Sequence, residues 1–164
     1  MEPVAGGHDS DHTTDSEENP VRHDAKLDRI RAVPLFADTD RKHLEGIAQL
    51  CTELSAKAGN VLCREGEPGA EFFVLLDGTV TVTSGGRELA TLGAGDFFGE
   101  LALLDGKARN ATVTAASDLQ LLVLSRQEFT TLVHDDPQVA VRMLPAIGAR
   151  LRGAAEPAQG SPVV

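Results

Sequence analysis

The chain has 164 residues, of which 41% are hydrophobic, and this is enough for one domain with a single core. It contains 25 acidic and 15 basic residues, and the resulting net charge of −10 argues against general binding to nucleic acid or to a membrane surface. The chain has no apolar run near the roughly 20 residues that span a bilayer and no N-terminal signal peptide, so we expect a cytoplasmic protein.

The first 24 residues carry seven acids and one arginine, which accounts for −6 of the net charge. Low hydrophobicity with high charge predicts a disordered acidic tail over residues 1–24. The folded domain is predicted over residues 25–152. Residues 153–164 are mostly small and show no hydrophobic period, so we expect a flexible C-terminal tail.

Two helices are predicted at the start of the domain. Apolar residues at helical spacing predict a short helix over residues 25–33, which Pro34 ends. Thr39 or Asp40 can cap a second helix that runs to about Leu50.

The middle of the chain has a hydrophobic period of two, and turn residues, mostly glycine, divide it into short segments. Strands are predicted over residues 52–58, 60–64, 71–77, 79–84, 87–92, 110–116 and 119–125. Seven or eight short strands at this spacing indicate a β-roll or jelly roll. We therefore expect a mainly β fold of about eight strands with N-terminal helices and two C-terminal helices.

The helical period returns after the last strand. Ser125 can cap a helix over residues 126–133, and a final helix begins near Pro137. Pro145 and Gly148 lie inside this final helix. Because proline costs about 3 kcal/mol in a helix interior, we expect the helix to be kinked, broken or shorter than its apolar pattern suggests.

The most informative stretch is residues 97–113, FFGELALLDGKARNATV, in which an acid and a base stand among small residues. Gly99 ends a strand, and residues 100–104 can form one helical turn whose N–H groups suit an anion. Arg109 offers a planar fork of donors that matches phosphate oxygens, and Glu100 is an acceptor that suits a sugar hydroxyl. A ligand with one anionic group and one hydroxyl is a sugar phosphate or a nucleotide. The simpler interpretation is that Glu100 and Arg109 form a structural pair on a turn and bind no ligand.

This stretch resembles the phosphate-binding cassette of the cyclic nucleotide-binding domain family, in the pattern FGE-L-A-L followed by R-x-A-T-V. The family includes the catabolite activator protein, regulatory subunits of protein kinase A and cyclic nucleotide-gated channels, and the resemblance covers roughly residues 35–152. It implies that Glu100 takes the ribose 2′-hydroxyl and Arg109 the cyclic phosphate. It also implies that the main-chain amides of Gly99, Leu101 and Ala102 complete the phosphate cradle.

The chain departs from the family pattern beside the cassette. Ala108 stands where many members have proline, and Asn110 stands where members have alanine, serine or threonine. Asn110 and Ala111 are predicted to lie beside the nucleotide, so the choice between cAMP and cGMP stays open at this point. Apolar side chains are expected to line the pocket and to cover the base. The candidates for the walls are Leu62, Val74, Leu89 and Ala111, and the candidates for the lid are Leu144, Ile147 or Leu151.

The function implied is a non-catalytic sensor that binds a 3′,5′-cyclic nucleotide, with cAMP favoured, and passes a helix rearrangement to an unknown protein effector. No other cofactor and no metal are expected. The alternative is a degenerate member that keeps the fold only for protein–protein contact, and the presence of Glu100 and Arg109 argues against it.

The positions of residues in the sequence argue against two other classes of protein, a metalloenzyme and a transcription factor. A metalloenzyme on a similar β-roll needs histidine and carboxylate ligands on inward-facing strands, but no histidine lies between Thr52 and Ser125. A transcription factor needs a recognition helix, and about twelve residues after the last predicted helix leave no room for a helix-turn-helix motif. The two cysteines, Cys51 and Cys63, are expected to be reduced and buried.

Overall fold

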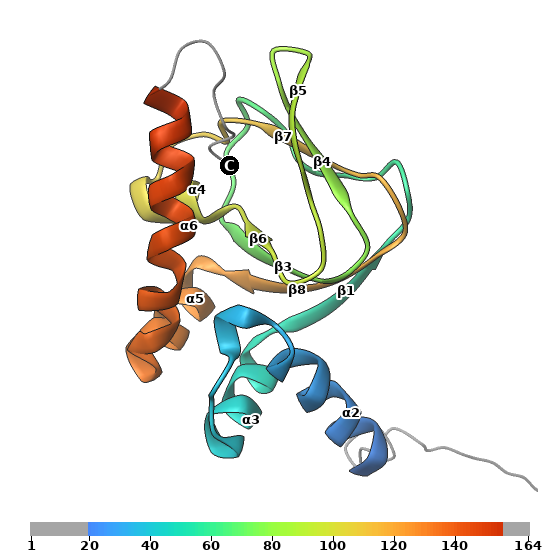
Figure 1. Cartoon of the computed structure of the whole chain (residues 1–164), viewed down its shortest axis with the longest axis vertical. Coiled ribbons are helices and arrows are strands. Elements are labelled where there is room, and N and C mark those ends of the chain that lie inside the picture. Colours follow the sequence, from blue (N-terminus) through green and yellow to red (C-terminus); the bar gives the residue numbers. More distant parts are fainter. Residues whose placement is uncertain (1–19, 156–164) are drawn as a thin grey trace, which may run out of the picture.

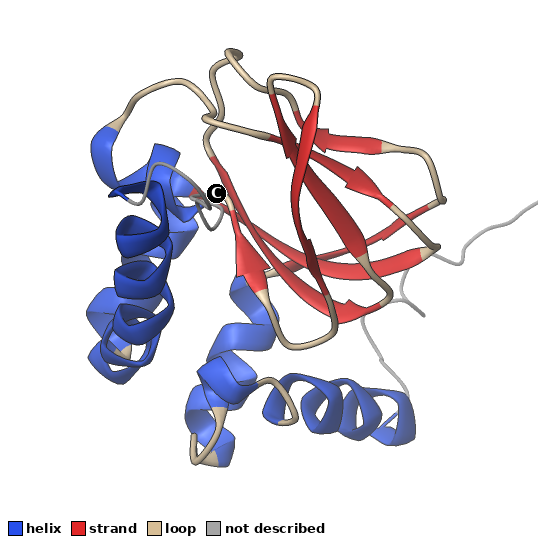
Figure 2. Ribbon diagram, turned by 45° about the horizontal axis from the view of Figure 1, so that its top comes forward, coloured by secondary structure: helices blue, strands red, loops and turns tan. Residues whose placement is uncertain are grey.

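The computed structural model of the protein describes residues 20–155, in which two four-stranded antiparallel sheets form a roll with helices against one of them (Figures 1 and 2). The helices are α2 (Pro20–Arg31), the 3-10 helix η1 (Pro34–Phe36), α3 (Arg41–Leu50), α4 (Glu100–Asp105), α5 (Arg126–Asp135) and α6 (Pro137–Ala155). The strands are β1 (Thr52–Ala56), β2 (Val61–Cys63), β3 (Glu71–Asp77), β4 (Val80–Ser84), β5 (Arg87–Leu92), β6 (Phe97–Phe98), β7 (Thr112–Ala115) and β8 (Leu119–Ser125).

The strand orders are β1-β8-β3-β6 in one sheet and β2-β7-β4-β5 in the other. The predicted bounds of β3, β5 and β8 agree with the structure residue for residue, because turn residues delimit these strands and the helix cap Ser125 ends β8. The predicted mainly β fold with flanking helices is confirmed.

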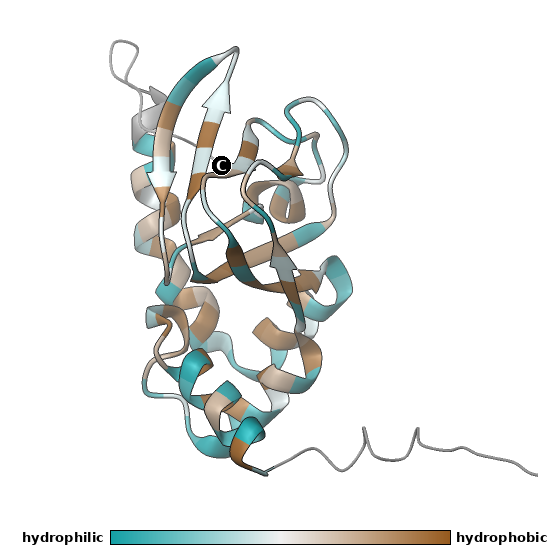
Figure 3. Ribbon diagram, turned by 90° about the vertical axis from the view of Figure 1, so that its right-hand side faces the viewer, coloured by the Kyte–Doolittle hydropathy of each residue, from teal (hydrophilic) through white to brown (hydrophobic). Residues whose placement is uncertain are grey.

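The central strands β3 and β8 of the first sheet are buried on both faces. One apolar cluster lies between the two sheets and includes Phe73 and Leu75, whereas a second lies between this sheet and the helices and includes Phe72 and Val74. Figure 3 shows hydrophobic residues along these central strands and hydrophilic residues in many of the surrounding loops. Val74 was expected to line the ligand pocket, and this was wrong, because the alternation along β3 turns its side chain toward the helices.

The N-terminal helix begins at Pro20, earlier than predicted, so residues 20–24 belong to the folded part and not to a tail. Proline is well suited to the first position of a helix. Within these residues, Asp24 Oδ1 lies 2.7 Å from Arg41 Nη2 at the start of α3. The remainder of the predicted acidic tail, residues 1–19, lies outside the described residues.

Helix caps follow the predicted chemistry. Asp40 caps α3 by accepting a hydrogen bond of 2.9 Å from the His43 main-chain N–H, and this bond lowers the pKa of the Asp40 carboxyl. Ser125 caps α5, and its hydroxyl and the Glu128 carboxylate form a reciprocal capping box. These two caps fix where the chain enters α3 and leaves β8.

Helix α6 is one continuous helix from Pro137 to Ala155, which excludes two of the three outcomes expected at Pro145, a broken helix and a shorter one. Pro145 frees the carbonyl oxygen of Val141, but both residues are exposed and water can hydrogen-bond to that oxygen. On the opposite side, Val139 and Met143 are buried against the domain. The helix therefore includes residues 153–155 of the predicted C-terminal tail, and residues 156–164 lie outside the described part.

Candidate functional site

The site is organised by a turn between β6 and α4 that only glycine fits. Gly99 has φ 91° and ψ 0°, in the left-handed region. A Cβ atom added there would lie 2.7 Å from the Glu71 carbonyl oxygen and 2.9 Å from Arg109 Nη1. The absence of a side chain therefore lets Arg109 and β3 approach the start of α4.

Arg109 is a buried cation held by the main chain. Its side chain is 7% exposed, Nη1 donates to the Gly99 carbonyl at 3.0 Å, and Nη2 donates to the Glu71 carbonyl at 2.9 Å. A Cβ atom at Gly69 would lie 2.0 Å from Arg109 Nε, so a second glycine makes room for the guanidinium. Both acceptors are neutral and the nearby Glu100 is paired with another residue, so the charge of Arg109 has no carboxylate partner among the described residues.

Glu100, the first residue of α4, is fully buried. Burial raises the pKa of its carboxyl, and the charge of Arg150 and the main-chain N–H groups of Glu100 and Leu101 oppose that rise. Oε1 accepts a hydrogen bond from Arg150, whereas Oε2 has no hydrogen-bond partner in the described part of the chain. A buried acceptor without a donor costs about 1–3 kcal/mol, so the site is suited to a ligand hydroxyl.

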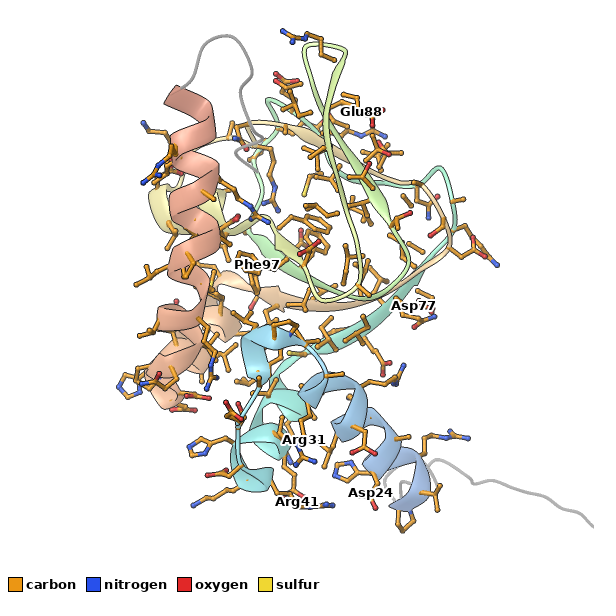
Figure 4. All side chains as sticks on the ribbon, viewed as in Figure 1. Asp24, Arg31, Arg41, Asp77, Glu88 and Phe97 are labelled. Atoms are coloured by element: carbon orange, nitrogen blue, oxygen red, sulfur yellow. The ribbon has the colours of Figure 1, made fainter. Side chains whose placement is uncertain are left out.

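Arg150 contacts the candidate site, although the sequence analysis did not identify it. It lies in α6, fifty positions after Glu100, and its side chain is 11% exposed. Nη1 donates to Glu100 Oε1, Nη2 donates to the Phe97 carbonyl at 2.7 Å, and the guanidinium carbon lies 4.7 Å from the centroid of the Phe97 ring. Figure 4 shows Phe97 between the β-roll and α6.

One signal in the sequence could have identified Arg150. It follows Met143 by seven residues and Ile147 by three, so it lies on the helix face that those apolar residues turn toward the domain. A charged residue on a buried helix face requires a partner. The sequence offers several acids, however, and nothing local selects Glu100 among them.

The other predicted site residues are distributed along the same segment. Leu101 is half-buried and Ala102 buried in the first turn of α4, Asn110 is exposed directly after Arg109, and Ala111 is buried between the sheets. Leu62 and Leu89, expected as pocket walls, are half-buried against the cluster between the sheets. The predicted site residues therefore lie along one segment from Gly99 to Ala111, and their contact with a ligand stays a prediction.

The three candidates for a base lid are not equivalent. Leu144 is 60% exposed and Leu151 54% exposed, whereas Ile147 is partly buried against the helix-side cluster. Arg150 is the residue of α6 that hydrogen-bonds to the cassette.

The two cysteines are buried and have high pKa values. Burial raises the pKa of Cys51 to about 12 and that of Cys63 to about 11, and in Cys63 the charge of Arg109 opposes the rise. Both therefore remain protonated thiols at neutral pH and are poor nucleophiles.

Residues 20–155 contain neither a candidate metal site nor a helix that could cross a membrane. No group of three or more histidine, cysteine, aspartate or glutamate residues there is arranged to hold a metal ion. No helix in that range has the length and apolar character needed to cross a membrane.

Comparison with known sequences places this geometry in a family. The sequence model of the cyclic nucleotide-binding domain matches residues 53–136. A cyclic nucleotide-gated potassium channel of Rhizobium etli is 40% identical over 111 residues, which are 68% of this chain and 31% of the channel. A cAMP-dependent protein kinase regulatory subunit of Schizosaccharomyces pombe is 33% identical over 63% of this chain and 26% of its own length. The chain thus spans less than a third of the length of each of these relatives.

Solved structures agree with the sequence comparison. A cyclic nucleotide-binding domain from Methylobacillus flagellatus has a TM-score of 0.71 with 25% identity, covering 81% of this chain and 82% of its own. The catabolite activator protein of Thermus thermophilus has a TM-score of 0.66 with 30% identity, covering 74% of this chain and 60% of its own. Since the family model matches half of the chain and the fold agrees, the chain belongs to the cyclic nucleotide-binding domain family.

Proposed function

We propose that the chain is a non-catalytic module that binds a 3′,5′-cyclic nucleotide between Arg109 and Glu100. The observation that carries this proposal is the state of Arg109, a buried guanidinium whose two described hydrogen bonds go to neutral carbonyl oxygens. A buried cation is costly unless it meets an anion, and a cyclic phosphate carries a single negative charge. The unpartnered Oε2 of Glu100 then accepts the ribose 2′-hydroxyl.

The named relatives support the ligand class and leave the base open. They include cAMP-dependent protein kinase regulatory subunits and a cGMP-dependent protein kinase of Caenorhabditis briggsae. Among structures, a cAMP-bound protein kinase A regulatory subunit has a TM-score of 0.64 with 27% identity. Membership in the family is therefore compatible with either nucleotide.

We favour cAMP over cGMP because of the chemistry of α6. The helix contains no acidic residue, so it offers no carboxylate to the N1–H and N2–H donors of guanine. Buried donors without acceptors cost about 1–3 kcal/mol, and adenine has fewer of them to satisfy. Asn110, directly after Arg109, has both a donor and an acceptor and is the residue best placed in sequence to change this preference.

The signal is expected to leave the module through α6, whose Arg150 contacts the ligand-binding acid, and to reach a cytoplasmic protein effector. The alternative is a member that no longer binds nucleotide and serves protein–protein contact only. The two differ in whether the purified chain binds a cyclic nucleotide at all.

The test is calorimetric titration of the purified chain with cAMP, cGMP, 5′-AMP and 5′-GMP. We expect cyclic forms to bind more tightly than linear ones, because a linear monophosphate carries more charge and needs more room beside the Gly99 turn. Equal affinity for cyclic and linear forms would defeat the proposal, and no binding would favour the alternative.

The base preference is tested with Asn110→Ala in the same titrations. We expect the wild type and the variant both to prefer cAMP. A wild-type preference for cGMP that is lost in Asn110→Ala would overturn the choice of cAMP and make Asn110 the residue that reads the base.

A further inference from the structure

The tip of the β4–β5 hairpin is bonded to a distant loop by one side chain. Strands β4 and β5 are joined by a two-residue turn, Gly85 and Gly86, in which both residues have positive φ. Glu65, an exposed residue of the loop between β2 and β3, accepts hydrogen bonds from the Gly85 main-chain N–H at 3.0 Å and from the Ser84 hydroxyl at 3.1 Å. Because glycine restricts its own backbone least, these two bonds limit the motion of the tip.

The loop that carries Glu65 also holds the main chain of Arg109. The Gly66 N–H donates to the Arg109 carbonyl at 2.8 Å, and the Arg109 N–H donates to the Glu67 carbonyl at 2.9 Å. The main-chain N–H of Glu65 donates to the Thr112 hydroxyl oxygen at 3.0 Å, at the start of β7. The side chain of Glu65 therefore joins the hairpin tip to the segment that contains the proposed phosphate-binding arginine.

The pairing of β4 with β5 is irregular at Leu89, three residues beyond the turn. The strands pair on either side of it, which leaves Leu89 as the extra residue of a β-bulge. A bulge changes the direction in which a side chain points, and Leu89 lies half-buried against the apolar cluster between the two sheets. The hairpin thus directs Leu89, a predicted wall of the nucleotide pocket, toward the interior of the roll.

The two strands of the hairpin differ in how firmly they are held. Strand β4 also pairs with β7, and its residues Val80 and Val82 are fully buried. Strand β5 is the edge strand of the sheet, and β4 is its neighbour. Freedom to move therefore belongs to the tip and to β5, which carries Leu89, and the bonds to Glu65 restrain it.

From this arrangement we propose that Glu65 is a positioning residue for the nucleotide. It holds the hairpin tip against the Arg109 segment and thereby keeps Leu89 in contact with the base of the bound ligand. The phosphate contact does not depend on Glu65, because the Arg109 guanidinium is held by the carbonyls of Gly99 and Glu71. The proposal rests on the function proposed above, since it concerns the same ligand.

The test combines variants of the protein with a ligand that lacks the base. Glu65→Ala removes both bonds to the tip, whereas Glu65→Gln keeps a side chain of the same length that can still accept from the Gly85 N–H. Glu88→Ala is the matched control, because it removes the same charge from an exposed position on β5 of the same hairpin (Figure 4). Thermal unfolding reports whether each variant is folded.

Each protein is titrated by calorimetry with cAMP, or with cGMP if the wild type prefers it, and by NMR with ribose 3′,5′-cyclic phosphate, which has no base. We expect Glu65→Ala to weaken binding of the nucleotide by about threefold to tenfold, the range for one or two hydrogen bonds. The base-free ligand should bind to Glu65→Ala within about twofold of the wild type, because its contacts lie at the cassette.

We expect Glu65→Gln to recover most of the affinity for the nucleotide and Glu88→Ala to leave it unchanged. Equal losses for the two ligands in Glu65→Ala would overturn the proposal, because they would show that Glu65 supports the site as a whole. Unchanged affinity for the nucleotide in Glu65→Ala would overturn it as well.

Hydrogen exchange at the tip supplies a measurement that a purely structural role would not affect. A nucleotide that binds more tightly when the tip is held must in turn hold the tip, by thermodynamic linkage. We expect the Gly85 amide hydrogen to exchange faster in Glu65→Ala than in the wild type, and bound nucleotide to slow this exchange in the wild type. Exchange at Gly85 that does not respond to bound nucleotide would contradict the proposal. Failure of the wild type to bind either cAMP or cGMP would instead overturn the proposed function, and this inference with it.

Discussion

The site has two parts that differ in how the chain brings them together. The cassette, which we define as Gly99 to Arg109, is contiguous, and its geometry follows from one glycine turn and two bonds to main-chain carbonyls. Arg150 arrives from α6, fifty residues after Glu100, through the packing of a helix on the roll. Figure 1 shows α6 alongside α4 on the helix-covered side of the molecule.

Because the two parts are brought together in different ways, the cassette should determine ligand binding, whereas α6 should determine how binding is coupled to the rest of the protein. Changes in the cassette should impair nucleotide binding, and a change at the Gly99 turn should impair the fold as well, because Arg109 and the Glu71 carbonyl approach that turn closely. Changes on the exposed face of α6 should leave the fold intact, because the residues that α6 packs against the domain, such as Val139 and Met143, lie on its buried face. The four predictions that follow test this separation, from the largest expected effect to the smallest.

Gly99→Ala should have the largest effect, because it places a methyl group against both Arg109 and the Glu71 carbonyl. The left-handed backbone costs about 1–3 kcal/mol and the overpacking about as much again, so we expect a loss of about 2–5 kcal/mol of unfolding free energy and loss of nucleotide binding. Urea unfolding measures the free energy of unfolding, and calorimetry measures nucleotide binding.

The matched control is Gly106→Ala at the other end of α4. Gly106 also has positive φ, 71°, but an added Cβ atom there would meet nothing within 4 Å. We expect a cost of about 1 kcal/mol from the backbone alone. Equal costs at the two positions would show that the close approach of Arg109 to Gly99 contributes nothing.

Arg109→Lys should weaken cAMP binding by about 30- to 1,000-fold, or roughly 2–4 kcal/mol, and leave the protein folded. Lysine keeps the positive charge but cannot bond two carbonyls and a phosphate with one planar group. Calorimetry measures the affinity, and the melting temperature reports on the fold. Unchanged affinity with an unchanged melting temperature would mean that Arg109 is not at the phosphate.

Glu100→Gln should change how stability depends on pH. Because burial raises the pKa of Glu100 above its ordinary value of 4.5, the folded state holds this proton to higher pH than the unfolded state. Wild-type stability therefore falls as the pH rises from 4.5 through the folded-state pKa, by at most about 1.4 kcal/mol per pH unit for one proton.

The variant lacks this proton, so its unfolding free energy minus that of the wild type should increase with pH over the same window. Urea unfolding at several pH values between 4.5 and 8 measures the difference. A difference that is independent of pH would show that Glu100 has the same pKa in the folded and unfolded states. The same variant should bind cAMP more weakly, because an amide is a poorer acceptor for the hydroxyl than a carboxylate.

Leu144→Ala should have the smallest effect on stability. The side chain is 60% exposed on α6, so we expect a change in unfolding free energy of less than about 0.5 kcal/mol. Calorimetry with cAMP then shows whether Leu144 covers the base in the bound state. Loss of affinity without loss of stability would extend the role of α6 beyond the one side chain that reaches Glu100.

Much of the fold and the residue pattern of the cassette could be predicted from the sequence because both show in neighbours along the chain, whereas the bond from Arg109 to the Glu71 carbonyl joins distant segments. The strands β3, β5 and β8 follow from a period of two between turn residues, and the start of α5 follows from the capping chemistry of Ser125. The cassette could be recognised in the same way. Its pattern consists of a glycine turn, an acid and an arginine within eleven residues, and no distant residue is needed to recognise it.

The tertiary structure decided the features that depend on contacts between distant segments. In β3, the run Phe72 to Leu76 is apolar at every position, so periodicity could not show that Val74 faces the helices. Helix α6 continues through Pro145 because burial of its inner face outweighs the local cost of proline. The pairing of Arg150 with Glu100 was likewise settled only by packing, because spacing along a helix can predict that an arginine faces the domain but cannot identify the acid that it meets there.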